Sequence, residues 1–376
     1  MTMLLKKPKF RLPKAAKTRS LSAAELDQLA LELDALRQRT LADLGEADAQ
    51  YIRKIVALVR YSAFAGRGLL MLGWLPPAWL AGAGLLGFAK IVENMEVAHN
   101  VMHGQYDWMN DPSLNAKSYE WDIVGTSANW CKTHNYMHHT FTNIKGVDDD
   151  VGYGLLRLFP EQRWSPFFLG QPIYAVIFAL LFQWGVAIQD LELGKYFKGK
   201  KTKQQLALEY APVRAKIRKQ LFKDYVFFPL IAGPSFIPVF LGNLAANGIR
   251  NVWTFSIIFC GHFTEDAEIF PKSVLDNESR GHWYYRQIRG SSNLIGGRLL
   301  NLLSGNLSHQ IEHHLFPDIP AHRYAQLAPE VQEICQRYGI HYNTGSFAKQ
   351  FGQVVWRILR HSLPSQPQQA RVVAVL

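Results

Sequence analysis

The sequence has little cysteine, little charge and none of the marks of a signal peptide. Cysteine occurs three times in 376 residues, as Cys131, Cys260 and Cys335. This excludes a disulfide framework and a cysteine-ligated zinc or iron–sulfur site. Charged residues make up 19% and hydrophobic residues 48%, so the chain is not intrinsically disordered. The basic N-terminus lacks a short apolar core and a small-residue cleavage site, so we expect no cleaved leader.

Long runs without charge stand out instead. Residues 68–89, 164–189, 225–249 and 251–264 contain no Asp, Glu, Lys or Arg. A bilayer crossing needs about 20 mostly apolar residues. The sequence therefore predicts an all-α integral membrane protein of the inner, cytoplasmic membrane.

Basic segments orient the predicted spans. Residues 1–19 carry seven Lys or Arg and no acid, and residues 195–223 carry ten with one acid. The positive-inside rule places both segments, and hence both termini, on the cytoplasmic side. We predict four transmembrane helices in two hairpins, at roughly residues 52–75, 78–98, 224–242 and 248–263.

Three further parts complete the predicted organisation. Residues 164–189 are expected to lie in the interface or to re-enter without crossing, and Arg67 must snorkel or pair within the first hairpin. Residues 1–50 predict a basic tail and an amphipathic helix, because Ser22 and Glu25 fit a capping box before a leucine stripe. The membrane domain then covers residues 51–363, and residues 364–376 predict a flexible tail.

Histidine is the unusual residue. Nine of the 13 histidines form three clusters plus one, all beside predicted spans. They are His99 and His103; His134, His138 and His139; His309, His313 and His314; and His262. Two imidazoles four residues apart project from one face of a helix about 6 Å from each other. Such a pair can bind one metal, and an adjacent histidine can reach a second.

The number of imidazoles indicates which metal centre they form. Nine ligands exceed the four of a tetrahedral zinc and match two metals with open positions. Neutral imidazoles suit zinc, copper, iron and nickel. A centre that changes redox state with dioxygen favours iron, so we predict a di-iron site in a cytoplasmic helical cap.

Competing motifs explain less of the sequence. His309-Gln-Ile-Glu312-His313 matches the H-x-x-E-H signature of a zinc hydrolase with Glu312 as general base, but this leaves two clusters idle. Glu96-Val-Ala-His99 matches half of a ferritin-like di-iron motif, and no second copy occurs. A membrane metal sensor would need polar residues inside its spans, which are nearly free of charge.

These clusters resemble the histidine boxes of the membrane fatty acid desaturase superfamily. The resemblance covers roughly residues 60–345 and rests on His99-x₃-His103, His134-x₃-His138-His139 and His309-x₃-His313-His314. The resemblance includes the sequence around the third box, residues 306–317, and the segment after the second box, residues 143–149. It implies a di-iron site at the cytoplasmic face, to which His262 supplies the extra ligand between boxes two and three. Gln310 competes with His309 for one ligand position, and we favour His309.

The resemblance also implies an activity. Such an enzyme uses dioxygen and external electrons to place a cis double bond in a long-chain (C16–C18) acyl-CoA or acyl lipid. A mid-chain position is favoured, while Gln310 resembles enzymes that act toward the carboxyl end. Relatives with that glutamine often carry a fused cytochrome b5 domain. This chain has no haem-binding His-Pro-Gly-Gly, so we expect a separate donor such as a ferredoxin with an NAD(P)H reductase.

Some roles stay open at this point. A di-iron alkyl hydroxylase or an alkene-forming fatty acid decarboxylase would use the same boxes. Gln310, Asn306, Glu312 and Asp149 are candidates for orienting the ligands through hydrogen bonds. The basic segment at residues 195–223 fits anionic lipid, a coenzyme A phosphate or an acidic electron carrier, and nothing indicates nucleic acid.

Overall fold

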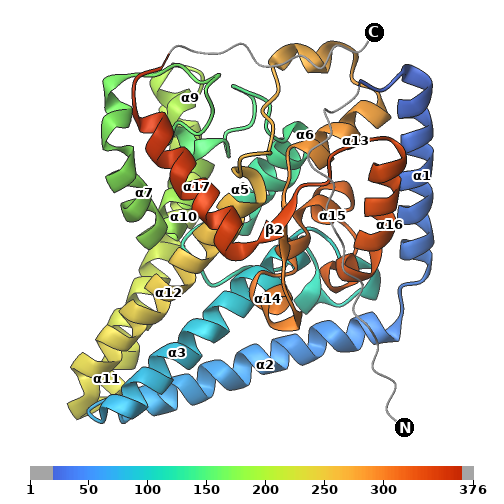
Figure 1. The fold of residues 1–376 in the computed structure, drawn as a ribbon. Coiled ribbons are helices and arrows are strands. Elements are labelled where there is room, and N and C mark those ends of the chain that lie inside the picture. Colours follow the sequence, from blue (N-terminus) through green and yellow to red (C-terminus); the bar gives the residue numbers. More distant parts are fainter. Residues whose placement is uncertain (1–19, 366–376) are drawn as a thin grey trace.

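The computed structural model describes residues 20–365. The basic tail at residues 1–19 and residues 366–376 of the expected C-terminal tail lie outside the described residues. Three long helices, α2, α3 and α12, converge at the lower left of Figure 1 and splay apart toward a cap of shorter helices. Among the described residues the only sheet pairs β1 (Asn293–Ile295) with β2 (Thr344–Ser346) in parallel. The predicted all-α class is confirmed.

The first predicted hairpin is present as two antiparallel helices. The chain turns at residues 72–75, between α2 (Glu46–Met71) and α3 (Pro76–Val92). Helix α3 begins with two prolines, whose fixed φ suits a first helical turn. Glycine permits the close approach of the pair. A Cβ on Gly66 would lie 2.8 Å from the backbone nitrogen of Leu86, and one on Gly82 would lie 2.9 Å from that of Leu70.

The second hairpin turns earlier than predicted. Helix α10 (Lys203–Phe222) continues through a π-helical turn, Lys223–Phe227, into α11 (Phe228–Ile231). The chain then turns near Gly233, whose φ is +54°, and α12 runs unbroken over Phe236–His262. The expected break between residues 242 and 248 is wrong. The side chains of Asn243 and Asn247 are buried and donate hydrogen bonds to Asp224, so they stabilise the helix there.

Arg67 has a charged partner, but not within its own hairpin. Its guanidinium lies 3.2 Å from a carboxylate oxygen of Asp224, which comes from the second hairpin. Lys90 of α3 lies 3.0 Å from the other oxygen of the same carboxylate. An unpaired buried charge would be costly, and the buried Asp224 carboxylate is paired with Arg67 and Lys90, which joins the two hairpins.

Residues 166–190 form a sharply bent pair of helices. Residues Pro166–Leu180 and Phe182–Asp190, which include α7 (Gln171–Leu180) and α8 (Phe182–Asp190), meet at 96°. This bent pair is long and apolar enough to cross a membrane when taken together. Within residues 20–365, no single helix passes the same test of length and composition.

The remaining helices build the cap. Helix α1 begins with the predicted capping box of Ser22 and Glu25, and its leucine stripe packs against α13 and α16. Besides the core that the α1 leucines form with α13 and α16, another hydrophobic core lies between α12 and the bent pair and continues beneath the histidine boxes. The cap helices and their neighbours are α1 (Ala23–Ala42), α9 (Leu193–Phe197), α13 (Arg280–Arg289), α14 (Arg298–Leu303), α16 (Tyr324–Arg337) and α17 (Phe347–Ser362).

Candidate metal centre

The first box lies where α3 leaves the hairpin. A π-helical segment, Glu93–Ala98, leads into the short helix α4 (His99–Met102), and His103 is the C-cap residue of α4. The rings of His99 and His103 are 4.6 Å apart, as expected for residues one helical turn apart. Turns of π-helix inside an α-helix are often found at functional sites.

The second box lies on another π-helical segment. Helix α5 (Ser127–Trp130) continues into the π-helix Cys131–His138 and then α6 (His139–Phe141). The rings of His134 and His138 stack at 5.0 Å, whereas His139 turns its ring nearly perpendicular to both. Adjacent histidines here therefore face different neighbours.

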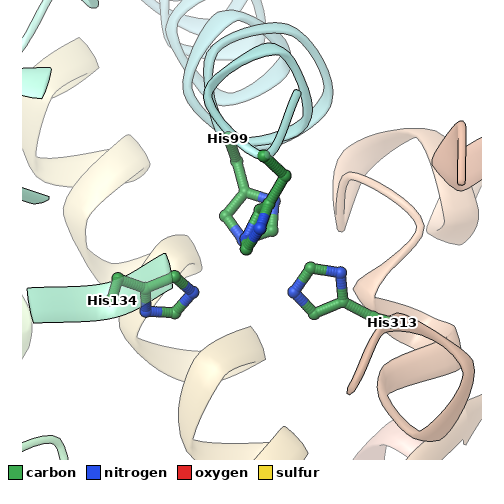
Figure 2. Close-up of side chains that lie close together, drawn as sticks. His99, His134 and His313 are labelled. Atoms are coloured by element: carbon green, nitrogen blue, oxygen red, sulfur yellow. The ribbon is translucent and has the colours of Figure 1, made fainter. Parts of the chain in front are cut away.

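The third box and His262 close the site. His313 and His314 lie on α15 (Gln310–Leu315), and His262 is the last residue of α12. All three are almost completely buried. Figure 2 shows His99, His134 and His313 directed toward one point from three different segments.

The histidines gather into overlapping groups that could each hold a metal. Within each group the ligand atoms all lie within 4.8 Å of one another. The first group is His99, His103, His134 and His313; the second is His138, His262 and His314; a third, His139, His313 and His314, joins them. Eight predicted histidines from segments up to 215 residues apart thus meet at one place.

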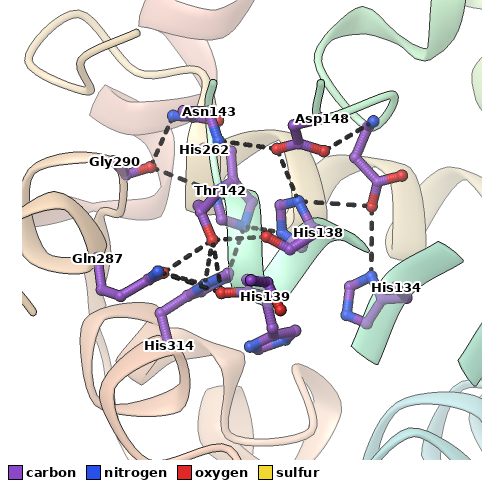
Figure 3. A network of polar contacts seen from close by, with 12 residues as sticks. His134, His138, His139, Thr142, Asn143, Asp148, His262, Gln287, Gly290 and His314 are labelled. Atoms are coloured by element: carbon purple, nitrogen blue, oxygen red, sulfur yellow. Dashed lines mark hydrogen bonds and ion pairs between the residues drawn. The ribbon is translucent and has the colours of Figure 1, made fainter. Parts of the chain in front are cut away.

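Most of these rings use their two nitrogens differently. The outer nitrogen, Nδ1, has a partner outside the cluster, as Figure 3 shows for part of the network. Asp148 lies 3.0 Å from Nδ1 of His138, Asp150 lies 3.3 Å from that of His134, and the carbonyl of Gly290 lies 3.2 Å from that of His262. Such contacts fix the orientation and tautomer of a metal-ligating histidine.

Several of the inner nitrogens, Nε2, have no such partner. Nε2 of His103, His134, His139 and His313 is buried without a hydrogen bond, and Nε2 of His262 faces those of His138 and His314 at 3.3 and 3.1 Å. Buried polar atoms rarely lack a partner. Burial lowers the pKa of His99 to about 3, so its ring is neutral, as a ligand must be. The donor set therefore fits two metal ions at the centre.

Gln310, not His309, faces this centre. This corrects our preference for His309 as the ligand. Helix α15 begins at Gln310, so Gln310, His313 and His314 are i, i+3 and i+4 on one helix. His309 precedes that helix in a 3₁₀ turn, outside every histidine group found among the described residues. The Gln310 side-chain nitrogen, as placed, lies 3.0 Å from Nε2 of His262, and its buried oxygen has no partner.

The hydrogen-bonding roles also differ from those expected. Asp149 is exposed, whereas its neighbours Asp148 and Asp150 are buried and contact the histidines. Asn306 donates a hydrogen bond to Glu96, and Glu312 accepts from Asn293 and Tyr342. Asn306 and Glu312 therefore brace the box segments without touching a ligand ring, and Glu312 is not placed as a hydrolytic base.

Several supporting residues have no signal in the sequence. Asn100 lies 3.1 Å from Nδ1 of His99, Gln287 lies 3.0 Å from that of His314, and the Tyr324 hydroxyl lies 3.4 Å from that of His313. Gln287 and Tyr324 lie on α13 and α16. Only folding brings these helices against the third box.

A pocket leads away from the histidines along α12. Its wall combines ligand candidates with apolar and aromatic side chains from α8 and α12. Trp130 stacks on His134 at 4.4 Å and, with Trp121, lines the pocket. Buried polar groups line it as well, among them Gln183, Asp190, Arg250 and Thr254. A mainly apolar pocket that also contains candidate metal ligands suits a hydrocarbon chain.

The fold and this centre define a helical, histidine-rich metalloenzyme with an apolar pocket. The fatty acid desaturase family profile matches residues 33–346. The chain belongs to that family, and it is an oxidoreductase that desaturates fatty acyl chains.

Curated relatives agree with this assignment. The chain is 46% identical over 351 residues to the NADPH-dependent stearoyl-CoA 9-desaturase of Mycobacterium tuberculosis, covering 92% of this chain and 82% of the relative. It is 31% identical over 297 residues to the sn-1 linoleoyl-lipid 6-desaturase of Synechocystis, covering 77% of this chain and 81% of the relative. Both are similar to this chain along most of their length.

Proposed function

We propose that this chain introduces a cis double bond near the middle of a C16–C18 acyl-CoA at a di-iron centre. The observation that carries the proposal is the convergence of eight buried or half-buried imidazoles, four of which have an inner nitrogen without any protein partner. The 46% identity to a stearoyl-CoA 9-desaturase supports the mid-chain position and the coenzyme A thioester. The lower identity to a lipid 6-desaturase makes a front-end reaction on an acyl lipid the second candidate.

The residues divide into two ligand sets. His99, His103, His134 and His313 would hold one iron, and His138, His262 and His314 the other, with His139 between them. Gln310 completes the second set, because its side chain lies beside His262. Irons bound there supply dioxygen activation and the removal of hydrogen from an unactivated CH₂.

The protein around them positions the substrate. The pocket along α12 holds a hydrocarbon chain against the histidines and excludes water. Asp148 and Asp150 keep His138 and His134 in the ligating tautomer. A hydroxylase or a decarboxylase could share this centre, so the product decides between them.

We also propose that two hairpins insert into the cytoplasmic membrane with the histidines at its inner face. α2 with α3 forms one hairpin, and the helix ending in α11 forms the other with α12. Large apolar side chains are exposed along these helices, away from the cap, as a lipid-facing surface requires. They include Phe64, Trp74, Leu80, Leu230, Ile237, Leu241 and Leu244.

Electrons must come from another protein, because dioxygen-dependent desaturation consumes two per double bond. The Mycobacterium tuberculosis relative is NADPH-dependent. A ferredoxin with an NADPH reductase could supply electrons to this chain. The basic segment at residues 195–223 suits an acidic electron carrier.

Metal analysis and product analysis test the function together. The purified protein should contain two irons per chain and convert stearoyl-CoA to a cis-9 product only with dioxygen, NADPH, ferredoxin and reductase. His138→Ala should lose iron and activity, while His341→Ala, which changes a histidine outside the cluster, should keep both. Stoichiometric zinc as the only transition metal, or turnover without dioxygen, would overturn the proposal.

A further inference from the structure

Desaturation requires protons as well as electrons at a buried site. One –CH₂–CH₂– unit, one dioxygen, two electrons and two protons give one cis –CH=CH– unit and two waters. Substrate carbon supplies two hydrogens, so two further protons must enter from solvent in each turnover. Most of the histidines are buried and have an Nδ1 partner, so we look for another group to carry these protons.

Three consecutive residues of the π-helix that carries the second box each contact an acidic side chain. The three contacts differ in exposure, since the Lys132 side chain is 53% exposed whereas Asp190 is 3% exposed. They are Lys132 with Glu192 at 2.7 Å, Thr133 with Asp190 at 2.6 Å, and His134 with Asp150 at 3.3 Å. Asp190 is therefore the least exposed of the three acids, and it contacts the residue next to His134.

We propose that the buried carboxyl group of Asp190 donates protons to the pocket, an inference that rests on the proposed desaturase function. Asp190 lines the pocket together with His134 and His138. Its Oδ2 is buried without a hydrogen-bond partner. Both oxygens of Asp150, the other carboxyl group at the pocket, are engaged, one by Gln189 and one by His134.

Hydrogen-bond geometry favours a protonated Asp190. The Thr133 hydroxyl lies 2.6 Å from Asp190 Oδ1 and 3.1 Å from the carbonyl of Asn129. One hydroxyl has one proton and cannot donate to both acceptors. A protonated Asp190 can donate to Thr133, which then donates to Asn129. In agreement, burial raises the pKa of Asp190 to about 8, with nearby Asp150 and Glu192 adding to the shift and the Thr133 contact opposing it.

The proposed step is a simple proton transfer. The Asp190 O–H bond breaks, and its proton passes to an oxygen atom derived from dioxygen in the pocket, which leaves as water. The electrons come from the carrier that supplies the reaction. The Asp190 carboxylate is then reprotonated by a proton that enters from solvent.

Asp190→Asn tests the role, with Asp190→Glu and Asp149→Asn as matched comparisons. Asn keeps the size and the Thr133 contact but cannot donate a carboxyl proton, and Asp149 is an exposed acid of the neighbouring loop. We expect Asp190→Asn to retain iron and to bind acyl-CoA, yet to lose about tenfold or more of its product per dioxygen consumed. The missing product should appear as hydrogen peroxide. Asp190→Glu should recover coupling partly, and Asp149→Asn should match the wild type.

A measurement on the metal-free protein tests the protonation of Asp190 independently of enzyme activity. The infrared spectrum of the metal-free wild type at pH 7 should contain a protonated carboxyl band that Asp190→Asn lacks. The proposal is overturned if that band is absent, if Asp190→Asn stays fully coupled, or if it loses iron, which would make Asp190 a positioning residue for His134. A wild-type protein without iron or desaturation would instead overturn the proposed function.

Discussion

Most histidines of the centre have a hydrogen-bonding side and a metal-binding side, and the two are specified by different parts of the chain. The inner nitrogens come from the spacing of the boxes. The outer contacts come mostly from elsewhere, as with Gln287 and His314, 27 residues apart. A motif search therefore finds the ligands and misses what orients them.

The position of Gln310 makes a testable prediction at this scale. Gln310→Ala should lower iron occupancy and activity, because it removes the side chain that faces His262. His309→Ala should keep both irons, since its Nδ1 contacts only Ser308 and its ring lies outside the groups. Metal analysis of the two purified variants distinguishes them. Iron loss in His309→Ala with none in Gln310→Ala would restore His309 as the ligand.

The acidic loop shows why sequence could not resolve the neighbouring contacts. Asp148, Asp149 and Asp150 are chemically identical. Their order in the sequence does not indicate which side chains point toward the histidines. In the structure the first and third point inward and the second points to solvent. Asp190 has no motif at all, and it enters the site only because α8 packs against the second box.

At the scale of elements, close packing of α2 on α3 predicts the effect of two glycine substitutions. Gly66→Ala should destabilise the protein by about 1–3 kcal/mol, because its new methyl group would meet the backbone of Leu86. Gly68→Ala, on the same helix with nothing within 4 Å, should be neutral or stabilise by up to about 1 kcal/mol. Thermal unfolding in detergent measures both. Equal unfolding temperatures for the two variants would mean that the helices do not approach so closely.

Uncharged runs located most of the long helices but not their ends. The proline pair at residues 76–77 marked the first turn correctly, because proline favours a helix start. The second turn was predicted between residues 242 and 248, where α12 is continuous and buried Asn243 donates a hydrogen bond to Asp224. Tertiary hydrogen bonds decided the boundary there, and no local pattern reports them.

At the scale of the whole molecule, removal of the metal should make stability strongly dependent on pH. Burial lowers the pKa of His99 to about 3 and that of His309 to about 4, and it lowers the pKa values of His103, His139, His313 and His314 well below the usual value for histidine. These rings are neutral in the folded state, whereas in the unfolded chain they bind protons below about pH 6.5. The unfolded state then binds more protons, so the folded state loses stability as pH falls from about 6.5 toward 4.

The size of this effect reports how many imidazoles share the centre. One such histidine contributes a slope of about 1.4 kcal/mol per pH unit, so several titrating together should give a steeper loss between about pH 6.5 and 5. Iron binds only the folded chain and should raise the unfolding temperature at pH 7.5 by mass action. Chelated and iron-loaded samples, unfolded thermally across this range, provide the comparison. A chelated protein equally stable at pH 7.5 and 5.5 would show that the histidines are not buried together.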